Sequence, residues 1–351
     1  MNMFSYFIPF TKKIGYFGWT GRGNLGDEAL FAIIKTLLKP VALVKFRKFY
    51  RKGKFLEVAQ ERILSGFMMG AGTLINSRGL LPIVKHFLGK KVPTFVFGAG
   101  VLDPEFYCQF PRYYNDMNEW VACLSLCKSV SVRGPLSAKS LMDYGYKDVQ
   151  IVGDPVLSYA SDIMAPVEIK NVIGINFGTT KNGSLLWGGS DDKVITFAVH
   201  LADTLIQKGF EVQFFPVWRN DTNVVASAAK QVKGNVKVWT HSENITRYLK
   251  AMEEVDIFIG EKLHSVIGAL CAYKPSIMLA YQSKCIDFMQ SVGLENYTLR
   301  TDCLNMDEVL FKIDTIQESY ETYRNFLFKE ISKLKNIQRE IANEIIESVN
   351  G

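Results

Sequence analysis

Short apolar segments alternate with glycine-rich turns and amphipathic stretches along most of the chain, and this alternation constrains the fold more than any other feature. Repeats of strand, turn and helix predict a mostly parallel sheet with helices on both faces, because parallel strands need a crossover connection. In the first series, strands are expected at 14–17, 41–45, 66–70, 93–97, 129–132 and 150–152.

The alternation breaks between residues 158 and 171 and then resumes, and from 306 to 349 the pattern is almost wholly helical and charged. A chain of 351 residues is long enough for about two domains. We therefore expect an α/β protein with two Rossmann-like domains and a helical C-terminal extension, the default ligand site being the cleft that the domains face. The expected limits are 1–165, 166–300 and 301–351.

Composition argues against several classes of protein. With 48% hydrophobic and 22% charged residues, the chain has enough apolar surface to fold. No apolar run reaches the roughly 18 residues of a membrane-spanning helix, and the first ten residues lack the order of a secretory signal. The six cysteines form no CxxC pair and have no zinc-finger spacing to histidine, so we expect a cytoplasmic protein without disulfides or a metal site.

One stretch is strongly basic. Lys45 to Lys54 holds six basic residues interleaved with aromatic ones, in a region without acids. A solvated edge or loop explains it most simply. A second interpretation is peripheral contact with an anionic membrane or with a phosphate-bearing acceptor. Nucleic-acid binding, which such a pattern also allows, is not the partner that we expect.

The first turn imitates two nucleotide-binding motifs and fits neither. Gly21, Gly23 and Gly26 spell GxGxxG, but the acid that a dinucleotide site needs about twenty residues later is missing. A P-loop would end in Gly-Lys-Ser/Thr, and here Asp27 follows the last glycine. Two alternatives stay open. The turn is a backbone platform for a polyhydroxylated ligand, with Asn24 and Asp27 bonding hydroxyls, or it is a tight turn with Asp27 capping the helix.

This segment, Gly18 to Glu28, resembles the N-terminal motif of the polysaccharide pyruvyl transferase family. The resemblance continues in the family's order through five further short motifs, which are Gly70-Ala71-Gly72, Ser131-Val132-Arg133-Gly134, Gly153-Asp154-Pro155, Lys262-Leu263-His264-Ser265, and Pro275 with Tyr281-Gln282-Ser283-Lys284. Each motif is weak alone, and together they are fairly specific.

The resemblance implies a GT-B-like fold and transfer of the enolpyruvyl unit of phosphoenolpyruvate onto a sugar. The usual product is a pyruvate ketal on a bacterial cell-surface polysaccharide, with phosphate released. Phosphoenolpyruvate is then a co-substrate, and no cofactor is implied. The acceptor would be a sugar carried on a polyprenyl diphosphate at the inner membrane face. It would meet the N-terminal domain at Gly23, Asn24 and Asp27, and the donor would meet the second domain.

Such a reaction needs an acid for the methylene carbon, cations for the carboxylate and phosphate, and a base for a sugar hydroxyl. Of the four histidines, His264 is the one that follows a strand end and starts a helix, at the edge where parallel sheets bind ligands. A helix N-terminus there also favours anions. We therefore expect His264 to be the general acid, the alternative being that it caps its own helix.

The resemblance places Arg133, Lys262 and Lys284 on the donor, together with Leu263 and Ser265. Arginine binds carboxylates and phosphates bidentately. Lys262 departs from the family, whose members more often carry arginine directly before Leu-His. For Arg133 the alternative is a surface salt bridge, and for Lys284 a solvated loop.

Asp221 is the predicted base. It follows a strand-end loop and could accept a hydroxyl proton. It could equally orient Arg219, or form a local Asx turn with Thr222.

Two other functions remain open. A GT-B glycosyltransferase that uses a nucleotide sugar would suit the same fold, although the segment 276–290 has no convincing glutamate clamp for a ribose. A non-catalytic glycan-binding or assembly protein is the second alternative.

Overall fold

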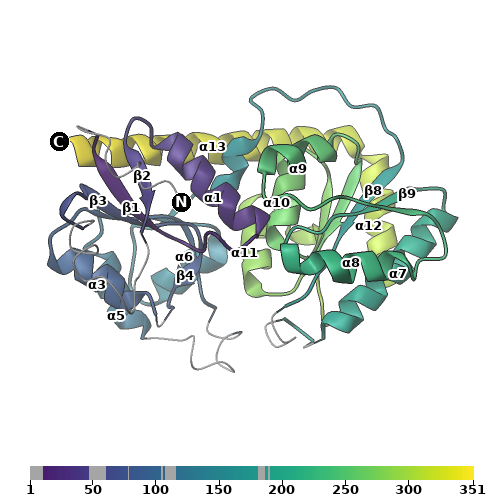
Figure 1. Ribbon diagram of the computed structural model, residues 1–351, viewed down its shortest axis with the longest axis horizontal. Coiled ribbons are helices and arrows are strands. Elements are labelled where there is room, and N and C mark those ends of the chain that lie inside the picture. The colour runs from purple at the N-terminus through teal and green to yellow at the C-terminus, as the bar shows by residue number, and fades with distance from the viewer. Residues whose placement is uncertain are drawn as a thin grey trace. The chain divides into compact units, whose positions relative to one another are not determined.

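The computed structural model describes residues 11–46, 61–77, 79–103, 106, 116–180, 186–188 and 190–351 (Figure 1). The chain divides into two compact units. The first contains the residues up to Thr20, Leu30–Pro155 and Lys335–Gly351, and the second contains Gly21–Ala29 and Val156–Leu334. These two units have other limits than the domains expected at 1–165, 166–300 and 301–351. The expected domain limits stay a prediction.

The first unit is built on one parallel sheet. Strand β4 (Gly72–Ile75) pairs with β5 (Thr94–Val101) and stands outside the order of the other strands. In sheet order, the other strands are β2 (Ala42–Lys45), β1 (Lys13–Phe17), β3 (Gly66–Met69), β5 (Thr94–Val101), β6 (Ser129–Val132) and β7 (Gln150–Ile151). Their register places Ile14 opposite Leu43 on one side and Gly66 on the other.

The described helices that accompany this sheet are α1 (Leu25–Leu37), whose first turn up to Ala29 belongs to the second unit, α3 (Leu81–Gly89), α5 (Met117–Leu124) and α6 (Pro135–Asp143). Figure 1 shows α3 and α5 side by side on one face of the sheet. Beneath them, Phe67 of β3 and Phe87 of α3 stack with ring centroids 4.0 Å apart. Trp120 of α5 is fully buried in the same core. The apolar faces of these helices therefore supply the layer that a buried parallel sheet requires.

The second unit also has a parallel sheet. In sheet order, its strands are β10 (Val236–Val238), β9 (Glu211–Phe214), β8 (Val172–Asn176), β11 (Ile257–Gly260), β12 (Ser276–Ala280) and β13 (Thr298–Arg300). Numbered along the unit, this order is 3-2-1-4-5-6. It reverses direction between β8 and β11, and ligands bind beyond the carboxyl ends of the strands at such a switch point.

Further helices described in this unit are α7 (Asp191–Gln207), α8 (Thr222–Ala229), α9 (Ile245–Met252), α10 (Leu263–Cys271), α11 (Ser283–Ser291), α12 (Met306–Glu318) and the first part of α13 (Tyr320–Asn350). Ser190 and Asn244 cap α7 and α9 by accepting backbone N–H groups of the first turn. Capping residues at these positions define where both helices begin.

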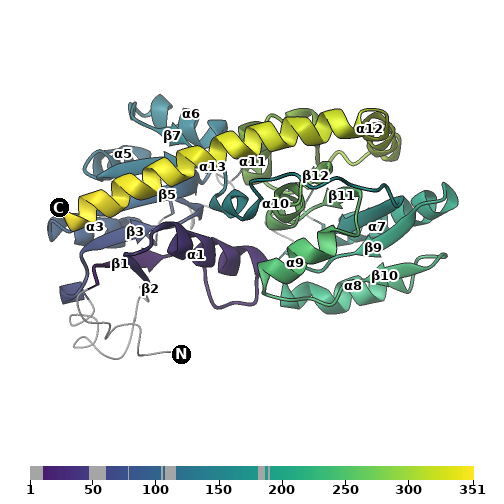
Figure 2. The same ribbon diagram turned by 90° about the horizontal axis from the view of Figure 1, so that it is seen from above.

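The C-terminal helical region predicted for 306–349 is present as α12 and α13, with a break at Ser319. Helix α13, the long yellow helix in Figure 2, belongs to the second unit up to Leu334 and to the first unit beyond it. In the second unit, the Tyr320 hydroxyl donates to the Asp256 carbonyl, and the Tyr323 hydroxyl donates to the Ser276 carbonyl. In the first unit, Gln338 donates to the carbonyl of Val152. The region is thus packed into both units.

Across the part of the chain that the structure describes, the helices are too short or too polar to span a bilayer. The basic stretch is described only at Lys45, which ends β2, and at Phe46. The remainder, Arg47 to Lys54, lies outside the described residues, so its contact with an anionic surface stays a prediction.

Candidate active site

The carboxyl edge of the second sheet is organised by Asn176, the last residue of β8, which is fully buried. Its Oδ1 accepts hydrogen bonds from the Lys262 backbone nitrogen at 2.8 Å and from the Ser265 hydroxyl at 2.9 Å. Its Nδ2 donates to the Phe215 carbonyl at 2.7 Å. One amide therefore joins the ends of β8 and β9 to the start of α10, at the switch point of the sheet. Sequence reasoning missed Asn176.

His264 lies in the first turn of α10 and is half-buried. Helix α10 begins without a side-chain cap, so the backbone N–H groups of its first turn are not satisfied by a capping side chain. Gly26 packs directly against the imidazole, because a Cβ added at Gly26 would overlap the ring at Cγ and Nδ1. Both residues belong to the second unit. The glycine therefore fixes one face of the histidine.

The glycine-rich turn before α1 is docked on the loop that follows β9. Asn24 and Trp218 form an antiparallel bridge. The Leu25 nitrogen donates to the Val217 carbonyl at 3.1 Å, and the Trp218 indole nitrogen donates to the Arg22 carbonyl at 3.2 Å. These bonds hold the turn in the second unit, although β1 before it belongs to the first.

The alternatives for this turn are partly resolved. Asn24 Oδ1 accepts from the backbone nitrogens of Gly26 and Asp27 at 2.9 and 3.3 Å, so Asn24 caps α1 in place of Asp27. Gly23 takes a φ of 74°, which favours glycine. Binding of an acceptor sugar by Gly23, Asn24 and Asp27 stays a prediction.

Two buried carboxylates lie beneath the segment that follows β8. The Thr179 nitrogen donates to Asp221 Oδ1 at 2.9 Å, and the Gly178 nitrogen donates to Glu261 Oε2 at 2.8 Å. Both carboxylates are fully buried. Burial raises the pKa of each, and the positive charge of Lys262 opposes this rise. Glu261 was missed by sequence reasoning, and the available signal was an acid directly after a buried strand.

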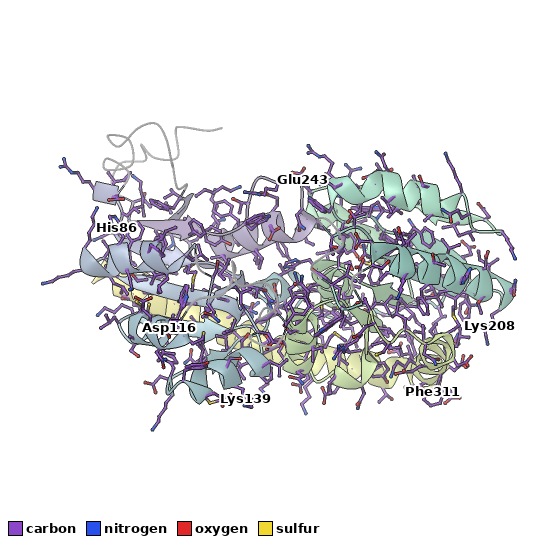
Figure 3. All side chains as sticks on the ribbon, turned by 90° about the horizontal axis from the view of Figure 1, so that it is seen from below. His86, Asp116, Lys139, Lys208, Glu243 and Phe311 are labelled. Carbon is purple, nitrogen blue, oxygen red and sulfur yellow. The ribbon has the colours of Figure 1, made fainter. Side chains whose placement is uncertain are left out.

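Asp221 does not orient Arg219, which was one interpretation of the sequence. The Arg219 guanidinium is exposed and pairs with Glu243, labelled in Figure 3, at 2.5 Å between Nη2 and Oε1. Because Asp221 is covered by the Gly178–Thr179 backbone, it would reach a sugar hydroxyl only if that backbone moved. Its role as a base stays a prediction.

Lys262 and Lys284 stand at the starts of neighbouring helices, α10 and α11. Their ammonium groups lie 5.1 and 4.6 Å from the centroid of the Tyr281 ring, in cation–π geometry. Lys262 Nζ also donates to the Thr179 carbonyl at 3.1 Å. Lys284 belongs to the first turn of α11 and not to a loop. Two cations thus share one aromatic ring at the carboxyl edge of the sheet.

Leu263 and Ser265 flank His264 on α10 and are both buried. The Ser265 hydroxyl lies 2.6 Å from the Lys262 carbonyl, as well as bonding Asn176. These contacts are internal to the fold. Direct donor contact by Leu263 and Ser265 therefore stays a prediction.

Arg133 follows β6 in the first unit and is only 1% exposed. Its Nε pairs with Asp154 Oδ2 at 3.2 Å, and Asp154 is itself fully buried, so this ion pair is not on the surface. Within the described residues, Nη1 of Arg133 has no hydrogen-bond partner, and neither has Thr73 Oγ1. A Cβ at Gly100 would lie 3.3 Å from Nη1 and 3.5 Å from Oγ1. Two unsatisfied polar atoms therefore flank this glycine.

The second unit brings together all but one of the predicted site residues, namely Gly23, Asn24, Asp27, Asp221, Lys262, Leu263, His264, Ser265 and Lys284. Arg133 belongs to the first unit. Lys262 and His264 stand at the start of α10, beyond β11 at the switch point of the second sheet, and Lys284 stands at the start of α11, beyond the next strand, β12. Ligands bind beyond the carboxyl ends of such strands, and cations there suit an anionic ligand.

Comparison with solved structures defines the fold class. A UDP-GlcNAc 2-epimerase from Neisseria meningitidis, solved bound to UDP-GlcNAc, is 12% identical with a TM-score of 0.59, covering 96% of this chain and 100% of the epimerase chain. A glycosyltransferase from Rickettsia africae is 12% identical with a TM-score of 0.54, covering 97% and 98% of the two chains. The chain therefore has the GT-B-like fold expected from its sequence.

The sequence family is narrower than this fold class. A family model described as polysaccharide pyruvyl transferase matches residues 24–283. The chain therefore belongs to the polysaccharide pyruvyl transferase family, a family of transferases. Comparison with curated protein sequences finds no match.

Proposed function

We propose that the protein transfers the enolpyruvyl unit of phosphoenolpyruvate onto a sugar of a polysaccharide precursor, forming a pyruvate ketal. The observation that carries this proposal is the half-buried His264 at an uncapped helix start, with Lys262 and Lys284 at the same sheet edge. An acid beside two cations suits a substrate that carries a carboxylate and a phosphate. Family membership supports the same reaction class.

The proposed reaction balances without a redox partner. His264 donates a proton to the methylene carbon, which becomes a methyl group. One sugar oxygen then bonds to the neighbouring carbon, and a second sugar oxygen bonds there as the C–O bond to phosphate breaks. One of the two hydroxyl protons restores His264, and the other leaves with the phosphate. Asp221, the predicted base, would accept the second of these hydroxyl protons from the sugar and pass it on to the departing phosphate.

In this proposal, Lys262, Lys284 and the first turn of α10 neutralise the donor's negative charges. Lysine supplies charge without the bidentate geometry of arginine. The donor role predicted for Arg133 stays a prediction, and the atom available for it is Nη1, which lacks a hydrogen-bond partner among the described residues. The acceptor residues proposed from the family resemblance are those of the docked turn.

A nucleotide-sugar glycosyltransferase is the competing function, since the neighbouring structures share the fold. Fold alone does not identify a substrate. After β12, the first acid is Asp287, which is 3% exposed within α11. An exposed carboxylate for a ribose is therefore missing from this described segment, and the pyruvyl transferase is the better supported function.

The deciding experiment measures phosphate released from phosphoenolpyruvate with a panel of galactose- and N-acetylmannosamine-containing acceptors. Mass spectrometry of the acceptor should show the added pyruvate ketal. Calorimetry without acceptor should show binding of phosphoenolpyruvate. The proposal fails if phosphoenolpyruvate neither binds nor releases phosphate while the same protein hydrolyses or transfers from a UDP-sugar.

Gly26→Ala should reduce turnover by up to about a hundredfold, because the added methyl group would displace the His264 ring and small misplacements of a reacting group have effects of this size. The comparison is turnover of Gly26→Ala and Gly89→Ala, since no atom lies within 4 Å of a Cβ placed at Gly89. Unchanged turnover in a folded Gly26→Ala protein would show that the ring position does not matter.

A further inference from the structure

Two carboxylates of the second unit share one short stretch of backbone. Glu261 accepts the Gly178 amide, and Asp221 accepts the next amide, that of Thr179. Gly178 packs directly against the Asp221 carboxyl, because a Cβ added at Gly178 would overlap the carboxyl carbon and both oxygens of Asp221. Glu261 directly follows β11, whereas Asp221 lies in the loop after β9, and both side chains contact the same two residues. The segment therefore depends on both of them.

Each carboxylate has one oxygen that is bonded and one that is not. Within the described residues, Asp221 Oδ2 and Glu261 Oε1 are buried and have no hydrogen-bond partner. A buried ionised carboxylate normally bonds through both oxygens, since an unsatisfied charged oxygen is costly away from water. Burying an unsatisfied oxygen costs less when the carboxyl is protonated and neutral. The unsatisfied oxygens thus point to fewer than two negative charges on the two groups.

The neighbouring charges support the same conclusion. Lys262 Nζ lies 3.6 Å from Glu261 Oε2 and bonds the Thr179 carbonyl. Burial is the largest influence on the pKa of Glu261 and raises it; Lys262 and the Gly178 amide act against this, and the charges of Asp221 and Asp191 add to the rise. Burial also raises the pKa of Asp221, while Lys262, the two hydrogen bonds from Thr179 and last His241 act against this. Two nearby buried carboxylates with one close ammonium do not readily both ionise.

We propose that Asp221 and Glu261 act as a pair of positioning residues that retains one proton at neutral pH and holds Lys262 and the Gly178–Thr179 backbone in place. With a single negative charge, the pair balances the charge of Lys262. A second negative charge would repel an anion at the start of α10. This consequence for substrate binding rests on the proposed function, whereas the retained proton does not.

The stability of the protein against pH tests the pair without any substrate. A carboxyl whose folded pKa is raised stabilises fully below its unfolded pKa, and this contribution is lost as pH rises through the folded pKa. Removing the carboxyl in Glu261→Gln removes that loss and keeps an acceptor for the Gly178 amide. The urea midpoint of Glu261→Gln minus that of the wild type should therefore increase between about pH 5 and about pH 8.

Glu253→Gln is the matched control, because Glu253 is an exposed carboxylate at the end of α9 in the same unit. The urea midpoint of Glu253→Gln minus that of the wild type should not increase over this pH range. If the urea midpoint of Glu261→Gln minus that of the wild type stays constant or falls over this pH range, the proposal of a retained proton is wrong. If Glu261→Gln does not fold, Asp221→Asn serves in the same measurement.

Infrared spectroscopy tests the proton directly. The wild type at neutral pH should show the carbonyl band of a protonated carboxylic acid, and this band should disappear in the Asp221→Asn/Glu261→Gln double variant. The proposal is wrong if the wild type shows no protonated-carboxyl band, or if the double variant keeps the band. Both measurements remain valid if phosphoenolpyruvate is not the substrate, so failure here is distinct from failure of the proposed function.

Enzyme kinetics separate positioning from a role in chemistry. As pH rises and the second carboxyl ionises, the wild-type KM for phosphoenolpyruvate should rise by about tenfold, while Glu261→Gln should show a flat KM. A structural role alone would not produce this difference in the pH profile. A loss of kcat in Asp221→Asn with an unchanged KM profile and no effect on the infrared band would favour the predicted base instead.

Discussion

His264→Ala is expected to lower turnover of phosphoenolpyruvate by roughly two to four orders of magnitude. The imidazole is held at the uncapped start of α10 against Gly26, where a proton donor would face a ligand bound at the helix start. Lys262 and Lys284 remain in the variant, so binding of phosphoenolpyruvate, measured by calorimetry, should persist. The combination of retained binding and lost turnover identifies a group that acts in the chemical step.

His200→Ala provides the control for this experiment. His200 is an exposed residue of α7, so its removal should leave turnover and phosphoenolpyruvate binding as in the wild type. Circular dichroism should show that both variants are folded. Turnover of a folded His264→Ala protein within a few-fold of the wild type would remove His264 from the proposed mechanism.

Arg133→Ala is expected to lower the free energy of unfolding by about 3–5 kcal/mol, because it removes one partner of a buried ion pair. Asp154 is fully buried and would lose the guanidinium that lies 3.2 Å from its Oδ2. Urea denaturation measures this change. In protein that still folds, calorimetry should also show weaker binding of phosphoenolpyruvate than in Asp221→Ala.

The control for Arg133 is a surface pair in the same unit. Lys139 and Asp143 are both mostly exposed, so Lys139→Ala should change the unfolding free energy by less than about 1 kcal/mol. An Arg133→Ala protein as stable as this control would show that the buried pair contributes little. Unchanged donor affinity would separately exclude a donor role for Arg133.

Most strands were predictable because both faces of a parallel sheet are buried, which makes each strand a short apolar run. Strand β5 extends beyond the predicted 93–97 to Val101, through glycines that indicate a loop in sequence. Helix α11 was missed, since its polar first residues read as a loop. Local composition predicts these two elements wrongly, because strand pairing extends β5 and packing on the sheet stabilises α11.

The site was predictable where a short motif follows a strand end, as Lys262 and His264 follow β11. The roles of Asn176 and Glu261 depend on β8 lying next to β11, and the chain separates these strands by β9 and β10. No local pattern encodes that neighbour relation. The same applies to Arg133, whose partner Asp154 belongs to the loop after another strand. Arg133 and Lys262 were therefore predicted as site residues, but the long-range partners Asp154, Asn176 and Glu261 were not.

The docking of the glycine-rich turn in the second unit has a consequence for the order of events during synthesis. The bond between Trp218 and Arg22 joins residues 196 positions apart, and Gly26 meets a histidine still further along the chain. A nascent chain therefore carries the turn long before its binding partners exist, and this part of the unit is completed late. A fragment that begins at Val156 would keep His264 but lack the glycine that covers its ring, so dividing the gene between the two sheets would separate the histidine from its support.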